Sequence, residues 1–99
     1  MLDKLDRLMD NQFSNDGWGY RSYTTVIEVD EETGEEYEDC GVSAEEAITD
    51  LFHANGYTDE NFSVTQKTWS TSPATHEGYV SVVWCEDGKL HHEVYTLYN

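Results

Sequence analysis

The sequence predicts an α+β fold, in which two short amphipathic helices pack on an antiparallel β-sheet of about five strands in the order α-β-β-α-β-β-β. Two segments repeat apolar residues at helical spacing, and three later segments alternate apolar and polar residues as strands do. Turn sequences that contain Gly separate the expected strands. The 99 residues are expected to form one domain (1–99), because two cores of about 50 residues each are rarely stable without disulfides or metal.

The first helix is predicted at residues 2–13. Its apolar residues recur every three or four positions and so share one side, which we expect to face the core. They are Leu2, Leu5, Leu8, Met9 and Phe13. The Asn and Gly residues of segment 15–19 are typical of a loop that ends the helix, and this loop contains Trp18.

An acidic hairpin is predicted after the loop. Residues 20–29 are rich in Thr, Val, Ile and Tyr and favour a strand. One side of this strand carries Tyr23, Ile27 and Val29. Gly34 suits the left-handed position of a turn at 31–34, and a second strand is expected at 35–40. Both strands are densely acidic, and carboxylates that oppose each other across a hairpin destabilise it by up to about 1 kcal/mol per pair. We therefore expect these residues to serve a partner outside the fold.

The second helix has clear start and stop signals. Ser43 and Glu46 form a capping box at its start, and Gly56 is placed to end it. Its apolar side consists of Ala44, Ala47, Ile48, Leu51 and Phe52. Glu45, Glu46 and Asp50 lie on the outer side, where the first two also favour the positive end of the helix dipole.

Three further strands are predicted at 62–70, 78–85 and 90–98, and Asp87-Gly88 between the last two is a hairpin signal. If Cys85 pairs with Leu90, alternate residues divide between two faces. One face then carries Val80, Val82, Trp84, His91, Glu93, Tyr95 and Leu97, and the other carries Tyr79, Ser81, Val83, His92, Val94 and Thr96. Both faces are partly apolar, so we expect helices to cover one face and a partner to meet the other.

The sequence lacks the motifs of metal and catalytic sites. Its four His residues show no metal-ligand spacing, and adjacent His91 and His92 point to opposite faces of a strand. No nucleophile elbow or glycine-rich phosphate loop is present. Cys40 and Cys85 are expected to be buried thiols in a reducing compartment, because two cysteines do not make a disulfide framework. We expect no enzyme activity, no cofactor and no specific metal site, with weak cation binding by the acidic hairpin as an alternative.

Charge is the most informative property of the chain. Its 21 acidic residues outnumber its five Lys and Arg residues and give a formal net charge of −16. Thirteen of the acids lie between Glu28 and Glu60, where no Lys or Arg occurs. This concentration predicts one anionic face, whereas adaptation to high salt would spread acids over the whole chain. The charge disfavours direct binding to nucleic acid or an anionic membrane. No membrane span or signal peptide is apparent, so we expect a protein of the bacterial cytoplasm, in an infected or host cell.

These features predict an inhibitor that binds the basic nucleic-acid-binding surface of another protein, because carboxylates on strands and helices can be spaced like phosphates. The expected partner-binding residues are Trp18, Glu28, Asp30, Glu31, Glu32, Glu35, Glu36, Glu38, Asp39, Glu45, Glu46 and Asp50. Trp18 is included because an aromatic ring beside an anionic face is typical of a binding hot spot.

In size and charge the chain resembles the small acidic inhibitors that phages and mobile elements carry against CRISPR nucleases, restriction nucleases or uracil-DNA glycosylase. This resemblance carries over no individual residue. It implies an anti-CRISPR or anti-restriction DNA mimic, monomeric or homodimeric, whose partner is a CRISPR effector or a restriction nuclease. The alternatives are an immunity protein that neutralises a basic nuclease toxin, and an adaptor domain whose acids serve only solubility.

Overall fold

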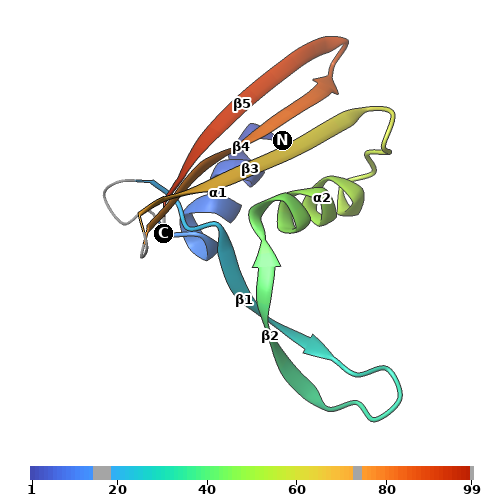
Figure 1. Cartoon of the computed structure of the whole chain (residues 1–99). Helices are drawn as coiled ribbons and strands as arrows, with labels where there is room; N and C mark the ends of the chain where they lie inside the picture. Colours follow the sequence, from blue (N-terminus) through green and yellow to red (C-terminus); the bar gives the residue numbers. More distant parts are fainter. Residues whose placement is uncertain (15–18, 73–74, 99) are drawn as a thin grey trace.

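The computed structural model describes residues 1–14, 19–72 and 75–98 (Figure 1). Its elements are α1 (Leu2–Gln12), β1 (Tyr23–Val29), β2 (Glu36–Ser43), α2 (Ala44–Ala54), β3 (Phe62–Ser72), β4 (Thr75–Glu86) and β5 (Lys89–Tyr98). The predicted α+β class and the order of the elements are confirmed.

The strands form two sheets, so the expectation of a single five-stranded sheet is wrong. In the part of the chain that the structure describes, β1 and β2 pair only with each other, and β3, β4 and β5 form an antiparallel sheet in that order. The position of α2 explains the separation. β2 ends at Ser43, which is also the N-cap of α2, and the start of that helix is tied to β3 by a hydrogen bond of 2.9 Å from the Glu45 backbone N–H to Gln66 Oε1. The chain is therefore already helical where β2 would have to pair with β3.

The two helices cover one face of the three-stranded sheet and enclose the core (Figure 1). The buried core residues are Leu5, Met9, Phe13, Ala44, Ile48, Phe52, Val80, Val82, Trp84, Tyr95 and Leu97. The Phe52 ring is stacked 5.0 Å from Phe62 and meets Trp84 edge-on at 5.5 Å, measured between ring centroids. Aromatic contacts thus supply much of the packing in a chain that is poor in aliphatic residues.

Both helices lie close to their predicted positions. Ser43 Oγ accepts a hydrogen bond of 3.1 Å from the Glu46 backbone N–H, as the capping box predicts, and Gly56 follows the end of α2 with φ 86°. In α1, Leu5 and Met9 are fully buried, as is Phe13 after the helix. The predicted apolar side is correct apart from its margin, where Leu2 is exposed.

The predicted register of β4 and β5 is confirmed, with Cys85 opposite Leu90. The turn that joins them has positive φ at Asp87 (53°) and Gly88 (74°), as a two-residue hairpin loop requires. The face that carries Val80, Val82 and Trp84 is buried under the helices, as expected. The outer face of the sheet is left uncovered by both helices.

Cys85 is exposed on that outer face, so the expectation of a buried thiol is wrong for this residue. Strand residues alternate between faces, and because Trp84 points into the core, Cys85 points away from it. The side chain of Cys40 lies outside the described part of the structure.

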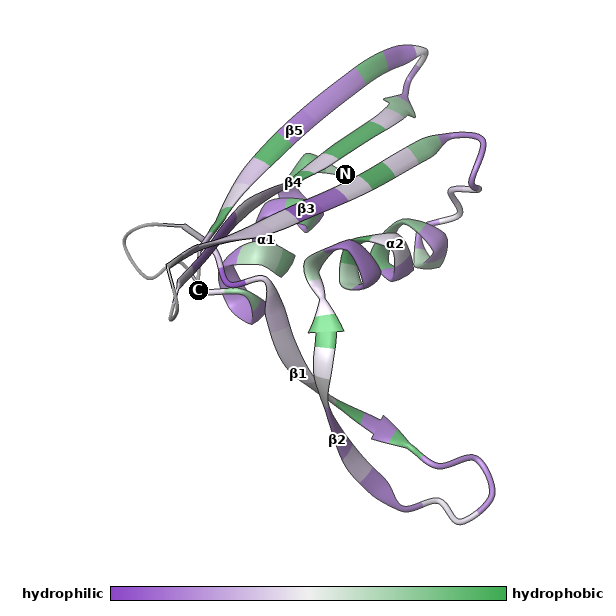
Figure 2. Ribbon diagram, viewed as in Figure 1, coloured by the Kyte–Doolittle hydropathy of each residue, from purple (hydrophilic) through white to green (hydrophobic). Residues whose placement is uncertain are grey.

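The β1–β2 hairpin projects from the body of the molecule as an arm, which we call the acidic arm (Tyr23–Ser43; Figure 1). The radius of gyration is 14.7 Å, compared with about 13 Å for a compact domain of 100 residues. Val42 packs at the base of the arm and is 5% exposed. A β-bulge lies just beyond it, between the pairs Thr24↔Val42 and Val26↔Asp39. Figure 2 shows the hydrophilic character of the turn at the far end.

Candidate functional site

The turn of the acidic arm is held by its own polar groups. Asp30 Oδ1 accepts hydrogen bonds from the backbone N–H groups of Glu32 (2.8 Å) and Thr33 (3.3 Å), and the Gly34 N–H donates to the Asp30 carbonyl at 2.8 Å. Gly34 has φ 72°, the left-handed conformation that the sequence predicts. Asp30 therefore stabilises the turn rather than projecting freely. Three other acidic side chains are exposed at the tip, those of Glu31, Glu32 and Glu35.

The strand register separates the carboxylates that we expected to oppose one another. The direct pairs are Val29↔Glu36, Glu28↔Tyr37, Ile27↔Glu38 and Val26↔Asp39. Each acidic residue of the two strands thus lies opposite an apolar or aromatic residue. Acids that share a face are about 6.6–7 Å apart along a strand or about 7–8 Å apart diagonally. The direct repulsion expected from the sequence is therefore avoided by the register.

The acids occupy two faces of the arm and its tip, so the prediction of one anionic face is wrong. One face combines Glu36 and Glu38 with Tyr23, Ile27 and Val29, which the sequence correctly placed on one side. These three side chains are 52%, 59% and 58% exposed, respectively. The other face carries Glu28, Tyr37 and Asp39. The β-pleat divides the acids because neighbouring residues of a strand point in opposite directions.

On this second face, Tyr37 and Glu28 interact directly. Tyr37 Oη donates a hydrogen bond of 3.0 Å to Glu28 Oε2, and this bond raises the pKa of Tyr37. Asp39 Oδ1 accepts a hydrogen bond of 3.2 Å from the Gly41 backbone N–H beside the bulge. Both carboxylates thus also stabilise the arm. Among the described residues, five acidic side chains of the arm have no hydrogen-bond or ion-pair partner: Glu31, Glu32, Glu35, Glu36 and Glu38.

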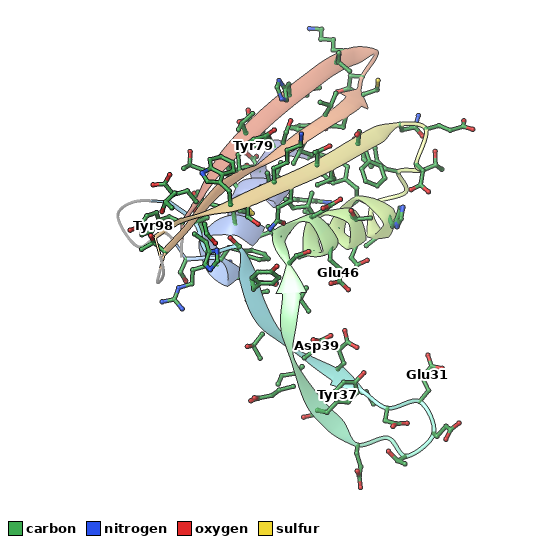
Figure 3. All side chains as sticks on the ribbon, viewed as in Figure 1. Glu31, Tyr37, Asp39, Glu46, Tyr79 and Tyr98 are labelled. Carbon is green, nitrogen blue, oxygen red and sulfur yellow. The ribbon has the colours of Figure 1, made fainter. Side chains whose placement is uncertain are left out.

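A groove of about 290 Å³ lies at the base of the arm, bordered by α1 and α2. Its apolar lining is formed by Leu8, Val42, Ala47 and Leu51. Three of the predicted partner-binding residues also line it, Glu28 from β1 and Glu46 and Asp50 from α2. These carboxylates are far apart in the sequence and are brought together by the fold. Figure 3 shows Glu46, Asp39 and Glu31 in succession from α2 to the tip of the arm.

Two of the predicted partner-binding residues belong neither to the acidic arm nor to the lining of this groove. Glu45 is exposed at the start of α2. Trp18 lies outside the described residues.

Sequence reasoning missed the exposure of Ile27, Val29 and Tyr37. Alternating apolar residues are equally typical of a core strand, so this pattern does not distinguish exposed from buried side chains. A signal was nevertheless present in the turn, because Gly34 fixes the register of the hairpin. That register places Glu36 and Glu38 on the same face as Ile27 and Val29, and a buried core would not accept two unpaired carboxylates.

The negative charge of the arm is not neutralised by its own chain. Within residues 1–14, 19–72 and 75–98, no Lys or Arg side chain forms an ion pair with a carboxylate. The same part of the chain contains no group of three or more His, Cys, Asp or Glu side chains that could hold a metal ion. An uncompensated anionic projection attracts cationic groups of a partner over a distance of about a Debye length, 8 Å at physiological salt.

Comparisons with protein-family models, with curated proteins and with solved structures gave no match. No helix among the described residues is both long enough and apolar enough to cross a bilayer. Because no relative indicates a function, the class of partner is inferred from the chemical character of the arm and of the groove at its base.

Proposed function

We propose that the protein is an inhibitor that inserts the acidic arm into the nucleic-acid-binding surface of a basic partner, as an anti-CRISPR or anti-restriction DNA mimic. One observation carries the proposal: the arm projects from the core and presents five carboxylates without partners in the described part of the chain. A CRISPR effector or a restriction nuclease offers the complementary surface, because a positively charged channel holds its nucleic acid. The place of action is the bacterial cytoplasm.

The spacing of the carboxylates supports this class of partner. Glu36 and Glu38 lie on one face at about 6.6–7 Å, and the tip adds three more acids. Duplex DNA carries one charge per about 1.7 Å of helix axis, so the arm has a lower charge density than the ligand it replaces. Charge attraction alone would therefore bind more weakly than DNA, and a competitor needs additional contacts.

The exposed apolar residues of the arm supply such contacts. Ile27, Val29 and Tyr23 lie beside Glu36 and Glu38, more than half exposed. Apolar and aromatic side chains buried at the centre of an interface contribute most of its binding energy, while charges steer the approach. A surface selected only for solubility would not retain a stripe of this kind, because exposed apolar side chains promote aggregation.

The experiment begins with affinity capture from bacterial lysates that contain CRISPR and restriction systems, with elution by a salt gradient and, separately, by duplex DNA. A captured nucleic-acid enzyme is then purified, and its DNA binding is measured by fluorescence anisotropy with increasing inhibitor. We expect competition between inhibitor and DNA. The variant Glu31→Gln/Glu32→Gln/Glu35→Gln/Glu36→Gln should keep its thermal stability and lose most of the inhibition.

The control variant removes the same number of charges outside the arm and the groove. It combines Asp3→Asn, Glu60→Gln, Asp87→Asn and Glu93→Gln. We expect this variant to inhibit nearly as well as the natural sequence. Equal loss in both variants would show a dependence on bulk charge alone, and simultaneous binding of DNA and inhibitor would overturn the mimicry. A complete lack of salt-sensitive partners would favour the solubility alternative.

A further inference from the structure

The outer face of the three-stranded sheet contains a second concave surface, which shares no residue with the acidic arm. It is a cleft of about 420 Å³, which we call the aromatic cleft. It is lined by Trp69, Glu77, Gly78, Tyr79, Thr96, Leu97 and Tyr98. Figure 3 shows Tyr79 and Tyr98 on the sheet, away from the arm. Its volume lies in the range of about 300–1,000 Å³ that is typical of small-ligand sites.

The strand register places a carboxylate between two aromatic residues. Trp69 on β3 pairs with Glu77 on β4, and Glu77 pairs in turn with Tyr98 on β5. Neighbouring strands are about 4.8 Å apart, so the two outer strands of this row are about 9.6 Å apart. A planar group that stacks between two rings needs about 3.5–4 Å on each side. Glu77 is exposed between these two strands, so its carboxylate can be reached from the cleft.

A third aromatic residue closes one side of the cleft. Tyr79 lies two residues after Glu77 and therefore on the same face of β4. Its ring centroid is 6.4 Å from that of Trp69, and the two ring planes meet at 65°. Trp69 remains 49% exposed despite this contact. The two rings form a corner with accessible faces rather than a closed stack.

Gly78 allows β3 and β4 to approach each other closely beneath the cleft. A Cβ atom at this position would lie 2.2 Å from the Lys67 carbonyl oxygen and 2.8 Å from Thr68 Cγ2. β3 and β4 therefore approach each other so closely that only glycine fits between them. Gly78 alternates with Tyr79 and belongs to the core-facing side of β4, so the rings of Trp69 and Tyr79 stand on the outer face of two closely spaced strands.

We propose that the aromatic cleft binds the guanidinium group of an arginine side chain from a protein partner. A guanidinium is planar and stacks on aromatic faces. It donates two parallel hydrogen bonds to a carboxylate, which Glu77 supplies here. Cation–π attraction adds to the stacking. The net charge of −16 favours any approaching cation over an anion.

Among the described residues, no Lys or Arg lines this cleft. Lys67 lies opposite Tyr79 in the adjacent row of the same face, but it is not part of the lining. Within the described residues, it forms no ion pair with Glu77. A lysine ammonium would also be a poorer occupant than a guanidinium, because it is not planar and cannot bridge both oxygens of one carboxylate in parallel.

The test is an NMR titration of the isotope-labelled full chain with the peptide acetyl-Gly-Arg-Gly-amide at 150 mM salt. Two matched peptides carry lysine or citrulline in place of arginine, and citrulline keeps the planar shape without the charge. We expect saturable shifts of the Trp69 indole N–H and the Gly78 and Thr96 amides with the arginine peptide, weaker shifts with lysine and none with citrulline. Glu77→Gln should weaken the arginine peptide at least about fivefold, and Trp69→Leu should abolish saturable binding.

The control variant is Glu93→Gln, which removes the same charge from the opposite face of the same sheet. We expect it to leave the affinity unchanged. Equal weakening by Glu77→Gln and Glu93→Gln, or shifts centred on the acidic arm, would overturn the proposal. Because the arm and the cleft share no residue, failure here leaves the proposed inhibition by the arm unaffected, and the reverse also holds.

Discussion

Replacement of Gly78 by alanine tests how closely β3 and β4 approach each other. The new Cβ atom would lie 2.2 Å from the Lys67 carbonyl oxygen and 2.9 Å from Thr68 Cα. Favourable contacts between heavy atoms begin at about 3.5 Å, so the two strands must separate by more than about 1 Å. The neighbours are backbone atoms, and no change of rotamer can relieve the contact.

The expected cost follows from this geometry. Overpacking of a well-packed site costs about 1–3 kcal/mol, and a clash with the backbone of the neighbouring strand belongs at the upper end, about 2–3 kcal/mol. For a domain of this size, 1 kcal/mol corresponds to about 4–8 °C, so we expect Gly78→Ala to lower the Tm by about 8–24 °C. The assay is thermal unfolding followed by far-UV circular dichroism, with the urea midpoint as a second measurement.

Gly41→Ala is the matched control, because it is the same chemical change in another strand. Its Cβ atom would meet only Asp39 Oδ1, at 4.0 Å, and the backbone of Gly41 is outside the left-handed region. We expect its stability to remain within about 0.5 kcal/mol of the natural sequence. Equal Tm values for the two variants would refute the close approach of β3 and β4 at Gly78.

Three further substitutions test the fold. Ser43→Ala removes the side chain that accepts the Glu46 N–H hydrogen bond and should lower the free energy of unfolding by about 1 kcal/mol, measured by urea titration. An unchanged urea midpoint would contradict a stabilising role for this capping hydrogen bond. Phe52→Ala removes a fully buried ring that packs on Phe62 and Trp84 and should cost about 3–5 kcal/mol, so that a small loss would show a poorly packed core. The hydrogen bond to Asp10 raises the pKa of Tyr20 from 10.0 to about 12. The unfolded chain therefore releases this proton first, and the stability that the bond contributes below pH 10 is lost as the pH rises to about 12. Tyr20→Phe should flatten the fall of the urea midpoint over this interval. An identical pH profile for the variant and the natural sequence would contradict the raised pKa of Tyr20.

The local elements were predictable from the sequence because each depends on interactions between near neighbours. The capping box at Ser43, the left-handed turns at Gly34 and Gly88 and the register of β4 with β5 are all confirmed. Hydrophobic periodicity also identified most of the core, since helical spacing determines which side chains share a face. The net charge and its concentration after Glu28 required only a count of residues.

The tertiary structure decided how the five strands associate and which apolar residues stay exposed. Strand propensity does not specify a pairing partner, so the sequence could not show that β2 would continue into α2 instead of joining β3. The same limit applies to Ile27 and Val29, whose pattern also suits a core strand but which lie on a projecting arm.

The acidic arm with its groove and the aromatic cleft show the same distinction between what the sequence determines and what the tertiary structure determines. Sequence alone located the acids of the arm, because charge is a property of composition. The grouping of Glu28 with Glu46 and Asp50 in one groove, and of Trp69 with Glu77 and Tyr98 in one row, required the fold. The physical reason is that these groupings depend on contacts between segments distant in the chain, whereas helix caps and tight turns depend on residues only a few positions apart.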